Sequence, residues 1–182
     1  CARRSRRVLL PPTSLTPTRP WSTNVAGLED LYREIILDHY RNPRNRGELE
    51  TPPAHMAEGF NPLCGDEIQV FLHVDADRIC DVSISGQGCS ISQSSASMMT
   101  TAVLGRTVDE ARQVIRAFKA MMSIHGDDLD GSDHDPSDET VGSQISLGDL
   151  EALRGVVKFP VRIKCATLAW NTLDQGLSEA TA

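Results

Sequence analysis

The sequence predicts an α+β domain in which a small antiparallel β-sheet packs against several helices. Apolar residues recur at helical spacing near residue 30, two segments alternate apolar and polar residues between 66 and 84, and helical patterns dominate after residue 90. A helix, a hairpin and then more helices is an order typical of α+β folds. With 182 residues, 40% of them apolar, we expect one domain with its own core over residues 28–182.

Residues 1–27 differ from the rest of the chain. They contain no acidic residue, four prolines that would interrupt any helix, and five arginines: Arg3, Arg4, Arg6, Arg7 and Arg19. We expect this segment to be a disordered basic leader. Its composition fits a targeting segment, a contact for something anionic or an artefact of the start site.

The charge of the remainder excludes one class of partner. Five of the 18 basic residues lie in the leader and all 25 acidic residues follow it, so residues 28–182 carry a formal charge of about −12. No nucleic-acid surface is therefore expected on the domain. No run of about 18 apolar residues occurs, so no membrane span is expected either. The five irregularly spaced cysteines favour reduced thiols and a cytoplasmic location over a disulfide framework.

The first element is an amphipathic helix that begins at Leu28 and stops at Asn42-Pro43. Its apolar residues share helical spacing: Leu28, Leu31, Tyr32, Ile35, Ile36 and Tyr40. Residues 41–63 then contain four prolines in turn-like groups. We expect a long loop there, leading into Cys64.

An antiparallel hairpin is expected next. Ile68, Val70, Leu72 and Val74 alternate with mostly polar residues, residues 75–77 offer a turn, and residues 79–84 repeat the alternation. The second strand runs into Gly86-Gln87-Gly88-Cys89. Ser90 and Gln93 form a capping-box pattern that predicts a helix from Ser90 through Leu104, which places Cys89 just before a helix start.

Three further helices are expected, at about 107–123, at 146–153 where Ser146 would be the cap, and at 161–177. The last would carry Cys165 near its start. Residues 124–145 are rich in Asp, Gly and Ser and predict an exposed acidic loop. A calcium loop is excluded because the sixth position counted from Asp128 is Asp133 rather than the glycine that the turn of such a loop requires.

Three cysteines in three settings carry the chemistry. Cys64 and Asp66 are two residues apart in an extended segment, so both side chains can reach one ion, and Gly65 lets the backbone bend. Cys89 and Cys165 both lie near predicted helix starts, where backbone dipoles favour a thiolate. Three thiolates and a carboxylate on zinc would leave a net charge near −2. Arg162 and Lys164, both close to Cys165 in sequence, could supply the compensating cations.

The residues alone leave an alternative open. A buried cysteine often serves as a small apolar residue, and no two of these cysteines have the short spacing of a zinc finger. The five histidines show no mutual spacing typical of a ligand pair, so each is interpreted as structural or solvated.

Four segments together resemble the U-type iron–sulfur cluster assembly proteins, most closely the SufU branch. They are Leu31–Pro43, Asn61–Asp66, Gly86–Ser92 and Arg162–Trp170, and the resemblance covers about residues 28–178. Scaffolds of the IscU branch have a histidine immediately before the third cysteine, whereas this chain has Lys164, as SufU-type proteins do. The acidic stretch around 124–145 resembles the SufU insertion between the second and third cysteines.

The resemblance implies that Cys64, Asp66, Cys89 and Cys165 bind zinc. It also implies that a SufS-type cysteine desulfurase donates persulfide sulfur to Cys64. A histidine of that partner would replace Cys64 on the metal during the transfer. The sulfur would then pass to a SufB-containing scaffold complex. Arg162 would assist by pairing with Asp66 or with the partner. Two alternatives stay open: a scaffold that carries an iron–sulfur cluster on the same residues, and a purely structural zinc module.

Overall fold

The computed structural model describes residues 27–123 and 146–181. The predicted α+β class is confirmed: within these ranges a three-stranded antiparallel sheet packs against five helices. Residues 1–26 of the predicted leader, which was expected over 1–27, and the acidic loop expected over 124–145 lie outside the described residues. The elements in chain order are α1 (Leu28–Arg41), β1 (His55–Asn61), β2 (Asp66–Asp75), β3 (Arg78–Gln87), α2 (Ser90–Val103), α3 (Val108–Ser123), the 3₁₀ helix η3 (Gly148–Lys158) and α4 (Pro160–Ala180).

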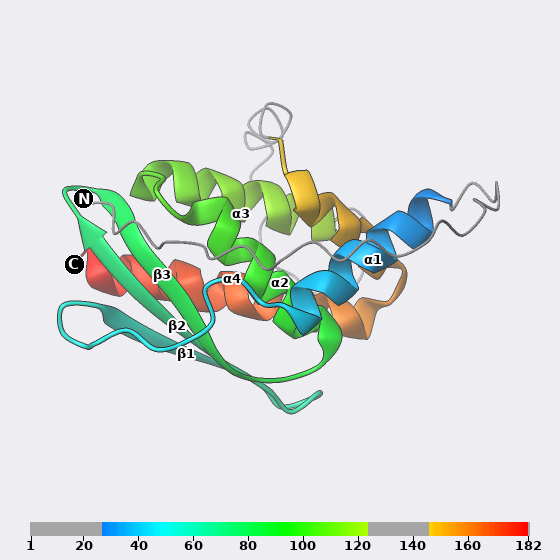
Figure 1. Cartoon of the computed structure of the whole chain (residues 1–182), viewed down its shortest axis with the longest axis horizontal. Coiled ribbons are helices and arrows are strands. Elements are labelled where there is room, and N and C mark those ends of the chain that lie inside the picture. Colours follow the sequence, from blue (N-terminus) through cyan, green and yellow to red (C-terminus); the bar gives the residue numbers. More distant parts are fainter. Residues whose placement is uncertain (1–26, 124–145, 182) are drawn as a thin grey trace, which may run out of the picture.

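The sheet has the strand order β1-β2-β3, so β2 is central (Figure 1). The predicted hairpin is confirmed as β2 and β3, with Val70 opposite Ile84. Its turn residues Ala76 and Asp77 both have positive φ angles, 46° and 63°, which suits a tight turn between twisted strands. The tip of the preceding β1–β2 hairpin holds Cys64, so the sheet presents this cysteine at one end.

Strand β1 was not predicted, and the expectation of one loop over 41–63 is wrong for its last third. The strand has no large apolar alternation because its core-facing positions are small or polar. Ala57, Gly59 and Asn61 face inward, and a Cβ on Gly59 would lie 2.0 Å from Thr172 Oγ1 of α4. Small residues let α4 approach β1 closely, and that requirement removes the pattern that identifies a half-buried strand.

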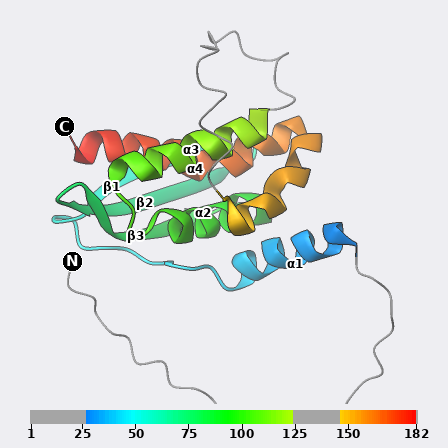
Figure 2. The same ribbon diagram turned by 90° about the horizontal axis from the view of Figure 1, so that it is seen from above.

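Helix α4 packs along the sheet, and α2 lies between α4 and α1 (Figure 2). The core centres on Trp170 of α4, which is fully buried and stacks on Phe118 of α3 with ring centroids 4.4 Å apart. The indole N–H of Trp170 donates to Ser95 Oγ at 3.0 Å, and that hydroxyl donates to the Ala166 carbonyl at 2.6 Å. Ser95, a buried polar side chain of α2, thus has both of these hydrogen-bond partners on α4.

The capping residue of α2 and the type and length of the helix before α4 differ from the prediction. Cys89, not Ser90, caps α2: its sulfur accepts a hydrogen bond from the Ser92 amide at 3.5 Å. The helix predicted over 146–153 is a longer 3₁₀ helix, η3, and α4 begins at Pro160, a residue suited to a first helical position. The helices predicted from Leu28, from Ser90 and at 107–123 are confirmed to within about one or two residues at each end.

Within residues 27–123 and 146–181, none of the helices has the length and apolar character needed to cross a bilayer.

Candidate metal centre

Three predicted ligands from two separate parts of the fold meet at one point. The ligand atoms of Cys64, Asp66 and Cys165 all lie within 4.8 Å of one another. Cys64 comes from the β1–β2 turn, Asp66 begins β2, and Cys165 lies on α4. Residues about 100 positions apart in sequence therefore converge, as the prediction of a shared site requires.

Asn61 stabilises the turn that carries Cys64 by accepting hydrogen bonds from its backbone. The Asn61 carbonyl accepts from the amides of Cys64 at 3.2 Å and Gly65 at 2.8 Å, and Asn61 Oδ1 accepts from the Leu63 amide at 3.2 Å. Gly65 adopts φ +68°, a conformation that favours glycine. Cys64 is half-buried at the tip of this turn, while Leu63 beside it is exposed. Its thiol therefore faces both the cluster and the surface.

Asp66 is completely buried, and the Cys89 segment holds its carboxylate. The Cys89 amide donates to Asp66 Oδ1 at 2.8 Å. Gly88 leaves the necessary room, because a Cβ there would lie 2.7 Å from the same oxygen. A buried carboxylate needs such partners, and this pair fixes the direction in which Asp66 Oδ2 points.

Cys89 lies at the margin of the cluster. Its sulfur is 3.9 Å from Asp66 Oδ2, but the group of three mutually close ligand atoms does not include it. The start of α2 directs the Ser92 amide at this sulfur, an arrangement that favours a thiolate. The structure thus brings Cys64, Asp66 and Cys165 together and leaves Cys89 adjacent to them through Asp66.

Cys165 is fully buried, and its thiol donates to Cys64 Sγ at a separation of 3.0 Å. The Asn61 side-chain amide donates to the Cys165 sulfur from another side at 3.7 Å. Burial, followed by the hydrogen bonds to Cys64 and Asp66 and by the charge of Cys89, raises the pKa of Cys165 strongly. The expected thiolate at this position is therefore a thiol unless a cation compensates for the charge.

Two cations precede Cys165 on α4: Arg162 lies about one turn before it, and Lys164 is its immediate neighbour. The pKa of the Arg162 guanidinium is raised, first by the charge of Cys89 and then by a hydrogen bond to Cys165. The side chains of Arg162 and Lys164 are exposed. The role of Arg162 as the compensating cation stays a prediction.

The comparison with known families decides the relationship. The family described as "NifU-like N terminal domain" matches residues 31–166 of this chain. This protein belongs to the NifU-like N-terminal domain family.

The individual relatives include a protein named as a sulfurtransferase and a protein named as a cluster scaffold. The zinc-dependent sulfurtransferase SufU of Bacillus subtilis strain 168 is 44% identical over 154 residues, covering 85% of this chain and 94% of the relative. The iron–sulfur cluster assembly scaffold protein IscU of Streptococcus pyogenes serotype M1 is 37% identical, covering 84% and 86%. The predicted resemblance to U-type assembly proteins, closest to SufU, is confirmed.

A solved structure agrees with this fold. A protein of Fervidobacterium islandicum AW-1, described as an iron–sulfur cluster assembly scaffold protein for the SUF system, superposes with a TM-score of 0.64 at 33% identity. The match covers 79% of this chain and 94% of that one. The NifU-like fold therefore extends over nearly all the residues described in this chain.

The donor set of this NifU-like domain fits a borderline-soft divalent ion. Thiolates and one carboxylate are ligands that zinc accepts in tetrahedral sites. The 3.0 Å approach of Cys64 and Cys165 and the buried Asp66 carboxylate beside them give a cluster that a cation would stabilise by removing thiol protons. The three-sulfur, one-oxygen ligand set itself stays a prediction.

Two supporting residues were missed at the sequence level. Asn61 hydrogen-bonds to both the Cys64 turn and the Cys165 sulfur, and Gly88 accommodates the Asp66 carboxylate. The Asn61-Pro62 pair is a turn signal, which could have indicated the role of Asn61. The pairing of Gly88 with Asp66 is a contact between two strands' ends, and no local pattern indicates it.

Proposed function

We propose that this protein is a zinc-dependent sulfurtransferase that accepts persulfide sulfur from a cysteine desulfurase and delivers it for iron–sulfur cluster assembly. The observation that carries the proposal is the unequal exposure of the clustered ligands. Asp66 and Cys165 are 0% exposed, whereas Cys64 is half-buried on a tight turn with open space around Gly65. Cys64 is thus the ligand that can leave, and the other two are anchors.

Cys64, Asp66, Cys89 and Cys165 would hold the ion in this proposal. Zinc, when bound, keeps the thiolates deprotonated near neutral pH and lowers their nucleophilicity. The buried carboxylate and Cys165 keep their positions through Cys89 N–H and Asn61. The name of the Bacillus subtilis relative, a zinc-dependent sulfurtransferase, supports this choice of metal and activity.

The transfer itself is a thiolate–disulfide-type exchange at Cys64. After release from the cluster, the Cys64 thiolate attacks the outer sulfur of the partner's cysteine persulfide. The S–S bond of the partner breaks, a new S–S bond forms on Cys64, and the partner's cysteine leaves as a thiolate. The same number of S–S bonds exists before and after, so no external oxidant or reductant is needed.

Arg162 would compensate for the charge that this exchange moves. It lies next to three groups that become thiolates, as the rise of its pKa by Cys89, Cys165 and Cys64 reflects. When Cys64 departs, Arg162 can pair with Asp66 or with the partner's persulfide. Exposed apolar residues near the ligands in sequence, Leu63 (67% exposed) and Val161 (61% exposed), offer a surface for the desulfurase, which we expect to be SufS-type.

A scaffold for an iron–sulfur cluster is the second candidate. The relative from Streptococcus pyogenes carries that description at 37% identity, and thiolates and carboxylate could also hold iron. Lys164 argues against it, because a lysine stands where the resemblance places a histidine ligand in scaffolds. In the favoured function, the sulfur moves on to a SufB-containing scaffold complex.

One experiment separates the two candidates. Protein purified without oxygen is analysed for zinc, iron and acid-labile sulfide, and the zinc-loaded form is added to a SufS-type desulfurase while alanine production is measured. The sulfurtransferase predicts about one zinc per chain and faster alanine production. Stoichiometric iron with labile sulfide, without stimulation, would sink it in favour of the scaffold.

A further inference from the structure

Arg46 lies outside the ligand cluster and yet reaches both sides of the turn that carries Cys89. Its Nη2 donates to the Gly86 carbonyl at 2.9 Å, and its Nη1 donates to Gln93 Oε1 at 2.9 Å. Gly86 is the second-last residue of β3, and Gln93 is in the first turn of α2. The planar guanidinium therefore spans the segment from Gly86 to Gln93, with Cys89 between its two contacts.

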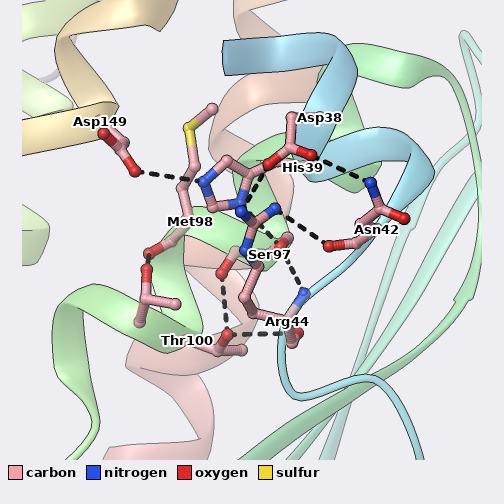
Figure 3. A network of polar contacts seen from close by, with 9 residues as sticks. Asp38, His39, Asn42, Arg44, Ser97, Met98, Thr100 and Asp149 are labelled. Atoms are coloured by element: carbon pink, nitrogen blue, oxygen red, sulfur yellow. Dashed lines mark hydrogen bonds and ion pairs between the residues drawn. The ribbon is translucent and has the colours of Figure 1, made fainter. Parts of the chain in front are cut away.

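The backbone around Arg46 is anchored independently. The Ile84 amide donates to the Asn45 carbonyl and the Gly47 amide donates to the Ile84 carbonyl, both at 2.9 Å, so residues 45–47 run beside β3 like a short extra strand. On the α2 side, the Arg44 amide donates to Ser97 Oγ at 2.8 Å (Figure 3). Hydrogen bonds thus hold in place the backbone from which the Arg46 side chain extends.

The two residues that Arg46 contacts are held in different ways. Gly86 is paired with Ile68 of β2; it adopts φ +117°, and a Cβ there would lie 2.3 Å from the Glu67 carbonyl, so the end of β3 requires glycine at this position. Gln93 is 5% exposed, and its Nε2 has no hydrogen-bond partner among the described residues. Arg46 fixes the orientation of that amide, because a flipped amide would direct N–H groups at the guanidinium.

We propose that Arg46 is a positioning residue that holds the Cys89 turn closed, so that Cys89 and Asp66 remain the fixed half of the centre while Cys64 moves. The connection to Asp66 is direct, since the Cys89 amide donates to Asp66 Oδ1 at 2.8 Å. A turn that opens removes both that N–H and the Cys89 sulfur from the site. The inference rests on the proposed function for its purpose, but its structural claim is tested without metal.

Arg44 provides a matched control for charge and location. It lies two residues from Arg46 in the same segment, but its side chain pairs with Asp38 of α1 and donates to the Asn42 carbonyl (Figure 3). Arg46→Gln and Arg44→Gln remove the same charge. Arg46→Lys keeps the charge and loses the two-pronged geometry.

The test measures the alkylation rate of each cysteine by iodoacetamide in reduced, metal-free protein, resolved by mass spectrometry. Arg46→Gln is expected to raise the rate at Cys89 by about threefold or more with Cys64 changing by less than about twofold, because the turn opens locally. Arg46→Lys should lie between this variant and the wild type, and Arg44→Gln should match the wild type. If Arg46→Gln does not fold, Gln93→Met, which removes only one acceptor, is expected to show a smaller rise at Cys89.

Two results would overturn the inference: an unchanged Cys89 rate, or equal acceleration at all three cysteines, which indicates general loosening. In zinc-loaded protein, Arg46→Gln should also release zinc faster to a chelator. If the protein binds no zinc, the proposed function fails, whereas the alkylation rates still decide the role of Arg46. The failures of the two proposals are thus distinguishable.

Discussion

The Cys89 amide donates to Asp66 Oδ1 at 2.8 Å, which joins the start of α2 to the start of β2 inside the ligand cluster. Gly88 makes this contact possible, because any side chain there would occupy the carboxylate's place. The anchoring half of the centre is therefore a single unit of backbone and carboxylate. Cys64 reaches it from a separate turn.

Gly88→Ala is expected to weaken metal binding. The new Cβ would lie 2.7 Å from Asp66 Oδ1, so the buried carboxylate must rotate and lose the Cys89 N–H. We expect a loss of about tenfold or more in zinc affinity, measured by competition with a chromophoric chelator. Gly155→Ala is the control, since its Cβ meets nothing within 4 Å. Equal zinc affinity in the two variants would contradict the role given to Asp66.

Cys64→Ala is expected to affect mainly sulfur transfer, whereas Cys89→Ala is expected also to lower the stability of the fold. Cys64 lies on a partly exposed turn, so its loss should abolish sulfur transfer with little change in the free energy of unfolding of metal-free protein. Cys89 also caps α2, so Cys89→Ala should cost about 1 kcal/mol of stability in the same form. Cys89→Ser retains a cap and should recover most of that stability.

The readouts are persulfide on Cys64 by mass spectrometry and chemical unfolding. A structural zinc module makes the opposite prediction. There, Cys64→Ala would destabilise the zinc-loaded protein as much as Cys89→Ala does, and no variant would change a transfer activity.

The sequence predicted those parts of the fold whose signals are local. Helix α1 and the β2–β3 hairpin follow from the spacing of apolar residues over a few turns or strands. The four ligand candidates followed from chemistry and local backbone, and three of them are confirmed as neighbours. The marginal place of Cys89 could not be predicted, because it depends on how α2 docks against α4 and β3.

Strand β1 shows where local signals fail. Its inward residues are chosen to fit α4, whose position depends on the whole sheet. The buried state of Cys165 has the same origin: position near a helix start predicts a thiolate, but burial, and after it the hydrogen bonds to Cys64 and Asp66, raise the pKa of Cys165 instead. Tertiary packing thus favours a protonated Cys165, whereas its position near a helix start favours the thiolate.

Gly59→Ala is expected to destabilise the protein by about 2 kcal/mol or more, because it overpacks the contact between β1 and α4. The Cβ would lie 2.0 Å from Thr172 Oγ1, 3.2 Å from Ile68 and 3.3 Å from Leu168. Thr172→Ala should recover part of the loss in the double variant, since the hydrogen bond of Thr172 Oγ1 is to the Leu168 carbonyl of its own helix. Additive losses by chemical unfolding would show that Gly59 is not in contact with Thr172.

The last prediction concerns pH and the buried His39 of α1. This side chain is 2% exposed, and its ring lies 2.8 Å from Ser97 Oγ of α2 and 3.4 Å from Asp149 Oδ2 of η3 (Figure 3). Burial lowers the pKa of His39 below its ordinary value of 6.5; Arg44 lowers it further, while Asp149 and Asp38 oppose the shift. The folded state therefore favours the neutral ring.

The sign of the effect follows from that direction. The unfolded chain takes up a proton at His39 as the pH falls below about 6.5, whereas the folded protein resists it, so stability present above pH 6.5 is lost as the pH falls toward the folded-state pKa. Each unit of pKa difference is worth about 1.4 kcal/mol. His39→Asn can keep a hydrogen bond to Ser97 and does not titrate, so its stability should depend less on pH. The measurement is chemical unfolding of metal-free wild type and variant between pH 5 and pH 8, and parallel curves for the two would refute the prediction, because the pH dependence would then come from other groups.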